Sequence, residues 1–182
     1  DPWNYRGSRF EAFKRGVLLH ACGDRLFGRG LELACANGET TVALASRCLR
    51  LAAVDSSPSA VAVARKRVTH LSRVTVGEAI LPRDMPKGPF DLIVMSELAY
   101  YLTRRDMLVL VDRIDRATAP GGVVVVLHHV VPFADAAQLP ASAQALAARL
   151  FSRTMILQSR YRAARFEAVA LKKPLGRLSC GA

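Results

Sequence analysis

The chain has no apolar run long enough to cross a bilayer, because Arg, Asp or Pro interrupts every hydrophobic stretch of its 182 residues. A membrane-spanning helix needs about 20 consecutive apolar residues. The sequence also has no internal repeat, no long Gly/Ser linker and no apolar signal region after Asp1. We therefore expect a soluble, cytoplasmic protein without a membrane span.

Cysteine is also scarce, and the cysteines that are present lie far apart and form no CxxC pair. They are Cys22, Cys35, Cys48 and Cys180. Zinc knuckles and dense disulfide frameworks need paired or closely spaced cysteines. We therefore expect neither a bound metal nor a disulfide framework.

Acidic residues are fewer than basic ones, with 15 Asp and Glu against 26 Lys and Arg, so that the formal net charge is +11. Such a charge attracts phosphates and anionic surfaces. The basic residues are, however, spread over the expected helices and the C-terminal region, without a low-complexity basic tail. We therefore favour solvated faces over a nucleic-acid-binding surface.

The length suits one ordinary domain. We place this domain at residues 1–175, with residues 1–22 as an N-terminal helical lid and residues 176–182 as a flexible tail. Apolar residues recur at helical spacing over residues 10–18, and Gly23 is placed to end that helix.

Short apolar runs alternate with helical stretches along the rest of the chain, which is typical of βα units and a parallel sheet. The five expected strands span residues 30–34, 49–55, 73–78, 90–96 and 121–129. Four helical stretches are expected between them, including residues 58–69 and 104–118. An Ala/Leu-rich helix at 141–151 then precedes two further strands, 154–159 and 166–171, which we expect to form a closing hairpin.

The first expected strand leads into a turn of small residues, Leu-Glu-Leu-Ala-Cys-Ala-Asn-Gly-Glu at positions 31–39. Small side chains let a ligand approach the backbone, and the start of the next helix offers free N–H groups. Gly38 is the only glycine of this turn, so the G-x-G-x-x-G pattern of a pyrophosphate-binding loop is absent from the sequence. The second strand ends in Asp55-Ser56, where a carboxylate can accept hydrogen bonds from both hydroxyls of a ribose. We favour this role for Asp55 over a simple helix cap.

The turn resembles motif I of the class I S-adenosylmethionine (SAM) dependent methyltransferases, written acidic-x-Gly-x-Gly-x-Gly. Glu32 and Gly38 match its ends, whereas Ala34 and Ala36 replace its first two glycines. Other features follow in the family's order, namely Asp55, Phe90-Asp91, Ser96-Glu97 and Ala-Pro-Gly-Gly at 119–122. The resemblance implies an α/β fold: a Rossmann-like, seven-stranded, mostly parallel sheet with helices on both faces and a C-terminal antiparallel hairpin. It also implies SAM as cofactor, S-adenosylhomocysteine (SAH) as product and no metal.

Within this class, nearly the whole chain is similar to the nodulation protein S group. The residues that carry the likeness are Asp1-Pro2-Trp3, Phe10-Glu11, the turn at 31–39, Glu97-Leu98-Ala99-Tyr100-Tyr101-Leu102, Ala-Pro-Gly-Gly and the strand at 166–171. The likeness implies methyl transfer to nitrogen, with an amino sugar of a chitin-like oligosaccharide as acceptor. It also implies that Trp3 and Lys14 lie near the cofactor.

The expected cofactor-binding residues follow from these motifs. They are Trp3, Lys14, Glu32, Ala34, Cys35, Asn37, Gly38, Asp55, Ser56, Ala79, Ile80, Ser96 and Glu97. Ala79 and Ile80 stand where the family often has an Asp that meets adenine, so we expect backbone groups and apolar contacts to hold the base.

The expected catalytic residues are Glu97, Tyr101 and His128. An amine acceptor must lose a proton before it attacks, and Glu97, His128 or His129 could serve as the base or as an anchor. The Tyr101 ring could face a sulfonium. Only one of the two histidines can face the site, because neighbouring residues of a strand point to opposite faces.

Other functions remain open at this stage. They are an O-methyltransferase of a small metabolite, an RNA-binding protein or RNA methyltransferase, and a noncatalytic SAM-fold protein. The net charge motivates the RNA hypothesis, but the sequence contains no Asn/Asp-Pro-Pro-Tyr motif. Arg160, Arg162 and Arg165 favour an anionic glycoside as the small-molecule acceptor if the closing hairpin lines the site. The oligomeric state is left open.

Overall fold

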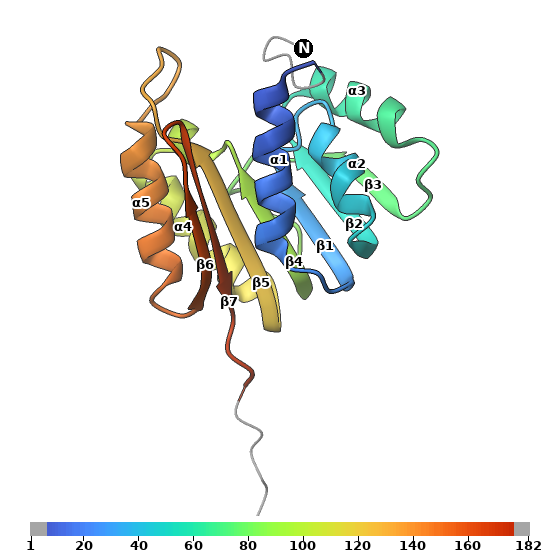
Figure 1. The fold of residues 1–182 in the computed structure, drawn as a ribbon. Helices are drawn as coiled ribbons and strands as arrows, with labels where there is room; N and C mark the ends of the chain where they lie inside the picture. Colours follow the sequence, from blue (N-terminus) through green and yellow to red (C-terminus); the bar gives the residue numbers. More distant parts are fainter. Residues whose placement is uncertain (1–6, 177–182) are drawn as a thin grey trace, which may run out of the picture.

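The computed structural model describes residues 7–176, which form a seven-stranded sheet with the order β3-β2-β1-β4-β5-β7-β6 (Figure 1). The strands are β1 (Phe27–Leu33), β2 (Cys48–Asp55), β3 (Val74–Glu78), β4 (Phe90–Ser96), β5 (Thr118–His129), β6 (Ile156–Arg162) and β7 (Phe166–Lys172). The helices are α1 (Arg9–Cys22), α2 (Glu39–Ala45), α3 (Pro58–Val68), the 3-10 helix η1 (Ala99–Tyr101), α4 (Arg104–Ala117) and α5 (Pro140–Phe151). The first five strands pair in parallel, and β7 pairs antiparallel with both β5 and β6.

The helices begin where the sequence supplies caps. The Ser8 side chain accepts a hydrogen bond from Glu11 N (3.2 Å) at the start of α1, and the helix ends at Gly23, whose φ is 82°. In α4, the Thr103 hydroxyl accepts from Asp106 N (3.1 Å). These side chains satisfy N–H groups that the helix itself leaves without partners.

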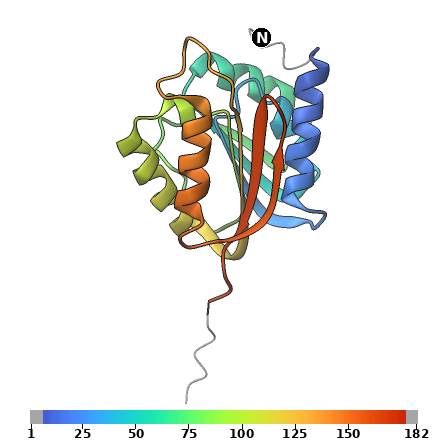
Figure 2. The ribbon, with the colours of Figure 1, turned by 60° about the vertical axis from the view of Figure 1, so that its left-hand side comes forward.

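The helices lie on both faces of the sheet, with α1, α2 and α3 on one face and α4 and α5 on the other (Figures 1 and 2). Alternating residues of the central strands feed two separate cores. In β4, Ile93 and Met95 pack with the side chains of α4 and α5, whereas Leu92 and Val94 pack with those of α1 and α2. Burial on both faces explains why β4 and β5 are nearly continuous apolar runs.

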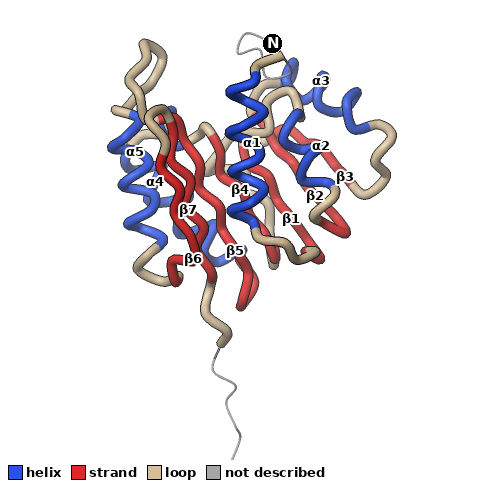
Figure 3. The backbone as a smooth tube through the Cα atoms, viewed as in Figure 1, coloured by secondary structure: helices blue, strands red, loops and turns tan. Residues whose placement is uncertain are grey.

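The sheet, its parallel strands and the antiparallel closing pair confirm the expected fold, but several boundaries differ (Figure 3). The helix expected between the third and fourth strands is absent from the described chain, because residues 79–89 form a turn at 81–84 and irregular chain around it. This segment contains Pro82, Pro86 and Pro89, and proline has no N–H group for a helical hydrogen bond. β1 begins at Phe27 and β6 at Ile156 instead of residues 30 and 154.

The expectations of no membrane span and no disulfide framework can be compared with the described part of the chain. None of the helices within residues 7–176 is both long and apolar enough to pass through a bilayer. Cys22, Cys35 and Cys48 are buried free thiols, and Cys180 lies outside the described residues.

Candidate active site

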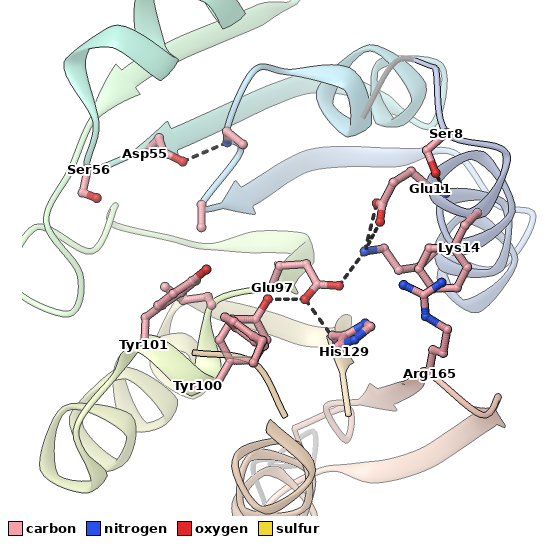
Figure 4. A pocket seen from close by; sticks show the side chains of 15 residues that line it. Ser8, Glu11, Lys14, Asp55, Ser56, Glu97, Tyr100, Tyr101, His129 and Arg165 are labelled. Atoms are coloured by element: carbon pink, nitrogen blue, oxygen red, sulfur yellow. Dashed lines mark hydrogen bonds and ion pairs between the residues drawn. The ribbon is translucent and has the colours of Figure 1, made fainter. Parts of the chain in front are cut away.

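A cavity of about 510 Å³ opens at the carboxyl ends of the parallel strands (Figure 4). In open α/β sheets this edge is where ligands bind. The antiparallel register pairs His129 with Phe166, which brings the start of β7 and the neighbouring Arg165 to the same edge. The lining residues are Ser8, Phe10, Glu11, Lys14, Ala34, Ala36, Asp55, Ser56, Glu97, Leu98, Tyr100, Tyr101, His129, Phe133 and Arg165.

The small-residue turn after β1 is locked to the end of β2. Ala34 and Ala36 both adopt positive φ, 57° and 46°, which directs the backbone sharply around the cavity wall. Ala36 N donates to Asp55 Oδ2 (2.8 Å), and Ser57 N donates to Asp55 Oδ1 (2.9 Å). Each carboxylate oxygen has a second lone pair, so Asp55 can accept further hydrogen bonds from a ligand.

Glu32 lies behind the turn and outside the cavity lining. It is 2% exposed, and the Thr41 hydroxyl donates to its Oε2 at 2.5 Å. Burial raises the pKa of the Glu32 carboxyl to about 8 despite this hydrogen bond, because removal from water penalises the charged form. Glu32 therefore joins β1 to α2 and does not line the cavity.

Glu97 follows β4 and occupies the centre of the site in a left-handed conformation, with φ at 53°. Its Oε1 lies 2.7 Å from Lys14 Nζ, and its Oε2 accepts hydrogen bonds from the Tyr100 hydroxyl and from His129 N (3.1 Å). Burial alone would raise the pKa of this carboxyl, but the Lys14 ammonium, with help from His128 and Tyr100, lowers it overall. Glu97 is therefore ionised at neutral pH.

Aromatic rings line the cavity beyond Glu97. The Tyr100 ring contacts Tyr101 (centroids 4.7 Å apart) and Phe133 (5.0 Å) edge to face. The His129 ring stands edge to face between Phe10 (6.4 Å) and Phe133 (6.5 Å). Burial lowers the pKa of His129, the Glu97 carboxylate opposes this effect, and Arg165 adds to the lowering, so that the pKa lies below its ordinary value. The result is an apolar, ring-lined compartment with a neutral imidazole in its wall at neutral pH.

The structure does not bring His128, one of the expected catalytic residues, into the cavity lining. The side chain is fully buried (0% exposed), its Nε2 accepts from Ala99 N (2.9 Å), and its Nδ1 lies 2.6 Å from Gln144 Oε1. Both ring nitrogens are engaged, and the ring is on the α5 side of the sheet. The next residue along β5, His129, is the histidine that lines the cavity.

The cavity unites six of the expected site residues, namely Lys14, Ala34, Asp55, Ser56, Glu97 and Tyr101. It does not include Glu32, Cys35, Asn37, Gly38, Ala79, Ile80, Ser96 or His128. Trp3 lies outside the described residues.

The expected residues outside the lining have structural contacts of their own. Cys35 is buried, which raises the pKa of its thiol, and Cys35 N donates to Val54 O at 3.0 Å. Gly38 begins α2 with a φ of 80°, and Asn37 O accepts from Arg67 Nε (2.7 Å). Ser96 lines a smaller hollow of about 30 Å³ beside α1.

The two residues expected to hold adenine also lie away from the lining. Ala79 is buried and its N–H donates to Asp55 O (2.9 Å), whereas Ile80 is 52% exposed. Asp84 Oδ2 accepts from Ile80 N (3.0 Å), so this backbone donor is already engaged.

The expected site residues did not include several lining residues, among them Glu11, and Arg165 was expected at the site only on condition that the closing hairpin lined it. Glu11 precedes Lys14 by three positions, and the two side chains form an ion pair of 2.9 Å. The helical i,i+3 spacing could have identified this pair. The sequence offered no comparable local signal for Arg165, whose position depends on the register of β7 against β5.

Comparison with known proteins gives a family match over the greater part of the chain. The model of the family described as Nodulation protein S (NodS) matches residues 1–120. Nodulation protein S of Rhizobium tropici is 32% identical over 127 residues, which cover 69% of this chain and 53% of the relative. Nodulation protein S of Bradyrhizobium diazoefficiens is 35% identical over 105 residues, covering 56% of this chain and 49% of the relative. The chain thus spans about half the length of the curated relatives it matches.

Solved structures agree with the fold. A crystal structure of the N-methyltransferase NodS from Bradyrhizobium japonicum WM9 in complex with SAH has a TM-score of 0.84 and 24% identity, and the match covers 96% of this chain and 92% of that one. A candidate methyltransferase from Pseudomonas syringae has a TM-score of 0.78 and 30% identity, covering 91% and 100%. These likenesses confirm the class I methyltransferase fold that the sequence motifs predicted. Together with the match over residues 1–120, they lead to the conclusion that the chain belongs to the nodulation protein S family.

Proposed function

We propose that the chain binds SAM in the cavity and transfers the methyl group to an amine of a small acceptor, with an amino sugar as the preferred class. The main support is a single geometric observation. Asp55, which ends β2, and Glu97, which follows β4, both line one cavity of about 510 Å³ at the carboxyl ends of the parallel strands. Family membership and the SAH complex of the Bradyrhizobium N-methyltransferase agree with this proposal.

The lining residues fit SAM in size and chemistry. Cavities of roughly 300–1,000 Å³ suit ligands of drug size. Asp55 offers acceptor oxygens to ribose hydroxyls, and Ala34 and Ala36 have side chains small enough to let a ligand approach the backbone. Ionised Glu97 can accept hydrogen bonds from an ammonium or amine.

SAM supplies a methyl group on a positively charged sulfur, which makes that carbon an electrophile. The protein contributes position and exclusion of water. Glu97 accepts an N–H hydrogen bond from the acceptor and so aims the nitrogen lone pair. Its lowered pKa makes it a poor proton acceptor, whereas the neutral His129 imidazole in the cavity wall suits removal of the ammonium proton. The rings of Tyr100, Tyr101 and Phe133 keep the reacting atoms away from bulk water.

Calorimetric titration with SAM and SAH tests the cofactor assignment. We expect both to bind, and we expect Asp55→Asn to weaken binding about tenfold or more, because it removes a charged acceptor of the ribose hydroxyls. Asp112→Asn is the matched control, since Asp112 is an exposed α4 residue paired with Arg116. Failure of the wild-type protein to bind either compound at millimolar concentration would refute the proposal.

Methyl transfer from labelled SAM to a chitin oligosaccharide with one free amine tests the acceptor. We expect Glu97→Gln to slow transfer about tenfold or more while SAM affinity stays within about threefold. A wild-type protein that binds SAM but methylates the hydroxyl form of the same sugar as readily would instead favour oxygen as the acceptor atom.

A further inference from the structure

The turn between β6 and β7 places one arginine in the cavity wall. Arg165 lines the cavity, and its guanidinium lies over the Phe10 ring, 4.0 Å from the centroid. A guanidinium that lies over a ring face can still donate N–H hydrogen bonds to an acceptor. The side chain is therefore held against α1 at the mouth of the site.

The other two hairpin arginines share one carboxylate partner. Arg160 Nε lies 3.1 Å from Glu167 Oε1, and Arg162 Nε lies 3.0 Å from the same oxygen. Within residues 7–176, none of the ion pairs involves Arg165. Lys14, the other cation of the cavity wall, is shared between Glu11 and Glu97. Arg165 is thus the cavity cation without a carboxylate partner in the described chain.

Strand order puts Arg165 on the acceptor side of the cavity. Asp55 ends β2, Glu97 follows β4 and Arg165 precedes β7, in the order β2-β1-β4-β5-β7. Neighbouring strands are about 4.8 Å apart, so Asp55 and Arg165 are separated by four spacings, or roughly 19 Å, with Glu97 midway. Figure 4 shows Asp55 and Arg165 on opposite sides of Glu97. If Asp55 holds the ribose, Arg165 lies beyond the point of methyl transfer.

The acceptor side is also the part that the family match does not cover. The matched residues, 1–120, include Lys14, Asp55 and Glu97 but end before His129, Phe133 and Arg165. The acceptor wall therefore need not select the same substrate as the matched relatives.

We propose that Arg165 forms an anion subsite for the acceptor, which carries a carboxylate, sulfate or phosphate group in addition to its amine. This inference rests on the proposed function, since it names the class of acceptor for the same cavity. The acceptor's amine lies at the Glu97 carboxylate, and its anionic group lies at the Arg165 guanidinium. Each charged group of the acceptor thus meets a cavity residue of opposite charge.

Binding of two matched probes tests the subsite independently of turnover. Glucosamine and glucosamine 6-phosphate are titrated into the protein saturated with SAH. We expect the phosphorylated probe to bind about tenfold tighter or more, with a difference that shrinks as salt is raised, because the guanidinium is exposed to screening. Arg165→Gln should abolish the difference and Arg165→Lys should keep part of it.

Arg162→Gln is the matched control, because Arg162 is an exposed arginine of the same hairpin outside the cavity lining. It should leave the preference unchanged. Equal binding of the two probes by the wild-type protein, or a preference that survives Arg165→Gln, would overturn the subsite.

SAH affinity separates this inference from two rivals. Arg165→Gln should change SAH affinity by less than about threefold, and a loss of tenfold or more would assign Arg165 to the cofactor carboxylate and overturn the inference. If the wild-type protein binds no SAH, the proposed function fails. The same probe titration without SAH then still measures the anion preference and its dependence on Arg165.

Discussion

Lys14 Nζ lies 2.7 Å from Glu97 Oε1, so an ion pair joins the middle of α1 to the residue that follows β4. The two side chains are 9% and 16% exposed, which limits screening by water and salt. Lys14 also lies 2.9 Å from Glu11 Oε2. The first helix is thus held over the cavity by charge as well as by its apolar face.

Lys14→Met should lower the free energy of unfolding at pH 7 by about 2 kcal/mol, because it leaves Glu97 largely buried without its counter-ion. Urea denaturation measures this loss. Lys66→Met, at an exposed position of α3, is the control and should change stability by less than about 0.5 kcal/mol. An equal effect of both substitutions would show that the pair adds nothing to stability.

The lowered pKa of Glu97 predicts an acid-side loss of stability. A carboxyl whose pKa is lower in the folded state stabilises the fold above its ordinary value of 4.5 and loses this contribution as the pH falls through the folded value. In Lys14→Met the folded pKa rises, so this contribution should no longer be seen. Denaturant midpoints between pH 7 and pH 3 test the difference, and parallel pH profiles for the two proteins would contradict it.

Glu32 predicts the opposite dependence on pH. Its pKa is raised to about 8 by burial, so its protonated form stabilises the fold below the ordinary value of 4.5, and this contribution is lost as the pH rises through about 8. Glu32→Gln should therefore gain stability relative to the wild-type protein between pH 5.5 and pH 9, by about 2 kcal/mol. Urea denaturation midpoints of the two proteins at pH 5.5 and pH 9 show whether the stability of Glu32→Gln relative to the wild-type protein rises or falls with pH.

Gly38→Ala should destabilise the protein by about 1–3 kcal/mol. Gly38 has a φ of 80°, and an added Cβ would lie 3.0 Å from Ala64 Cβ and 3.1 Å from Ala64 Cα. Gly16→Ala is the matched control, because Gly16 lies within α1 with open space around it and should gain about 0.5–1 kcal/mol. Thermal denaturation compares the two, and a stabilised Gly38→Ala variant would argue against the described turn.

His128→Leu should lower the free energy of unfolding by about 2–3 kcal/mol, since it leaves Ala99 N–H and Gln144 without their buried partner. SAH affinity should remain within about threefold, because the ring lies outside the cavity lining. Denaturation and calorimetry on the same variant test both statements. Full stability combined with lost methyl transfer would instead return His128 to a catalytic role.

The local sequence pattern was enough to predict the strands of the sheet and the cavity residues that lie at the ends of those strands. The apolar runs of β4 and β5 are long because both faces are buried, and this signal is visible without a structure. Asp55 and Glu97 could also be predicted from the sequence. Asp55 ends one expected strand, Glu97 directly follows another, and the carboxyl ends of parallel strands meet at one edge of the sheet.

Other positions depended on relations that no local pattern contains. Strand alternation shows that only one of His128 and His129 can face the cavity, but the choice depends on which face of β5 meets α5. Glu32 points toward Thr41 on α2, a contact set by helix packing. Arg165 reaches the site only through the antiparallel register of β5 and β7, which pairs residues distant in sequence.

That register has an evolutionary consequence. The pairing of β5 with β7 runs from Val123 with Lys172 to His129 with Phe166, so it ends where the β6–β7 turn begins. Residues 163–165 can therefore change in identity without disturbing the strand ladder or the carboxylate of Asp55. If Arg165 contacts the acceptor as proposed, this turn is a position at which substitutions can change the acceptor while the strand pairing stays intact.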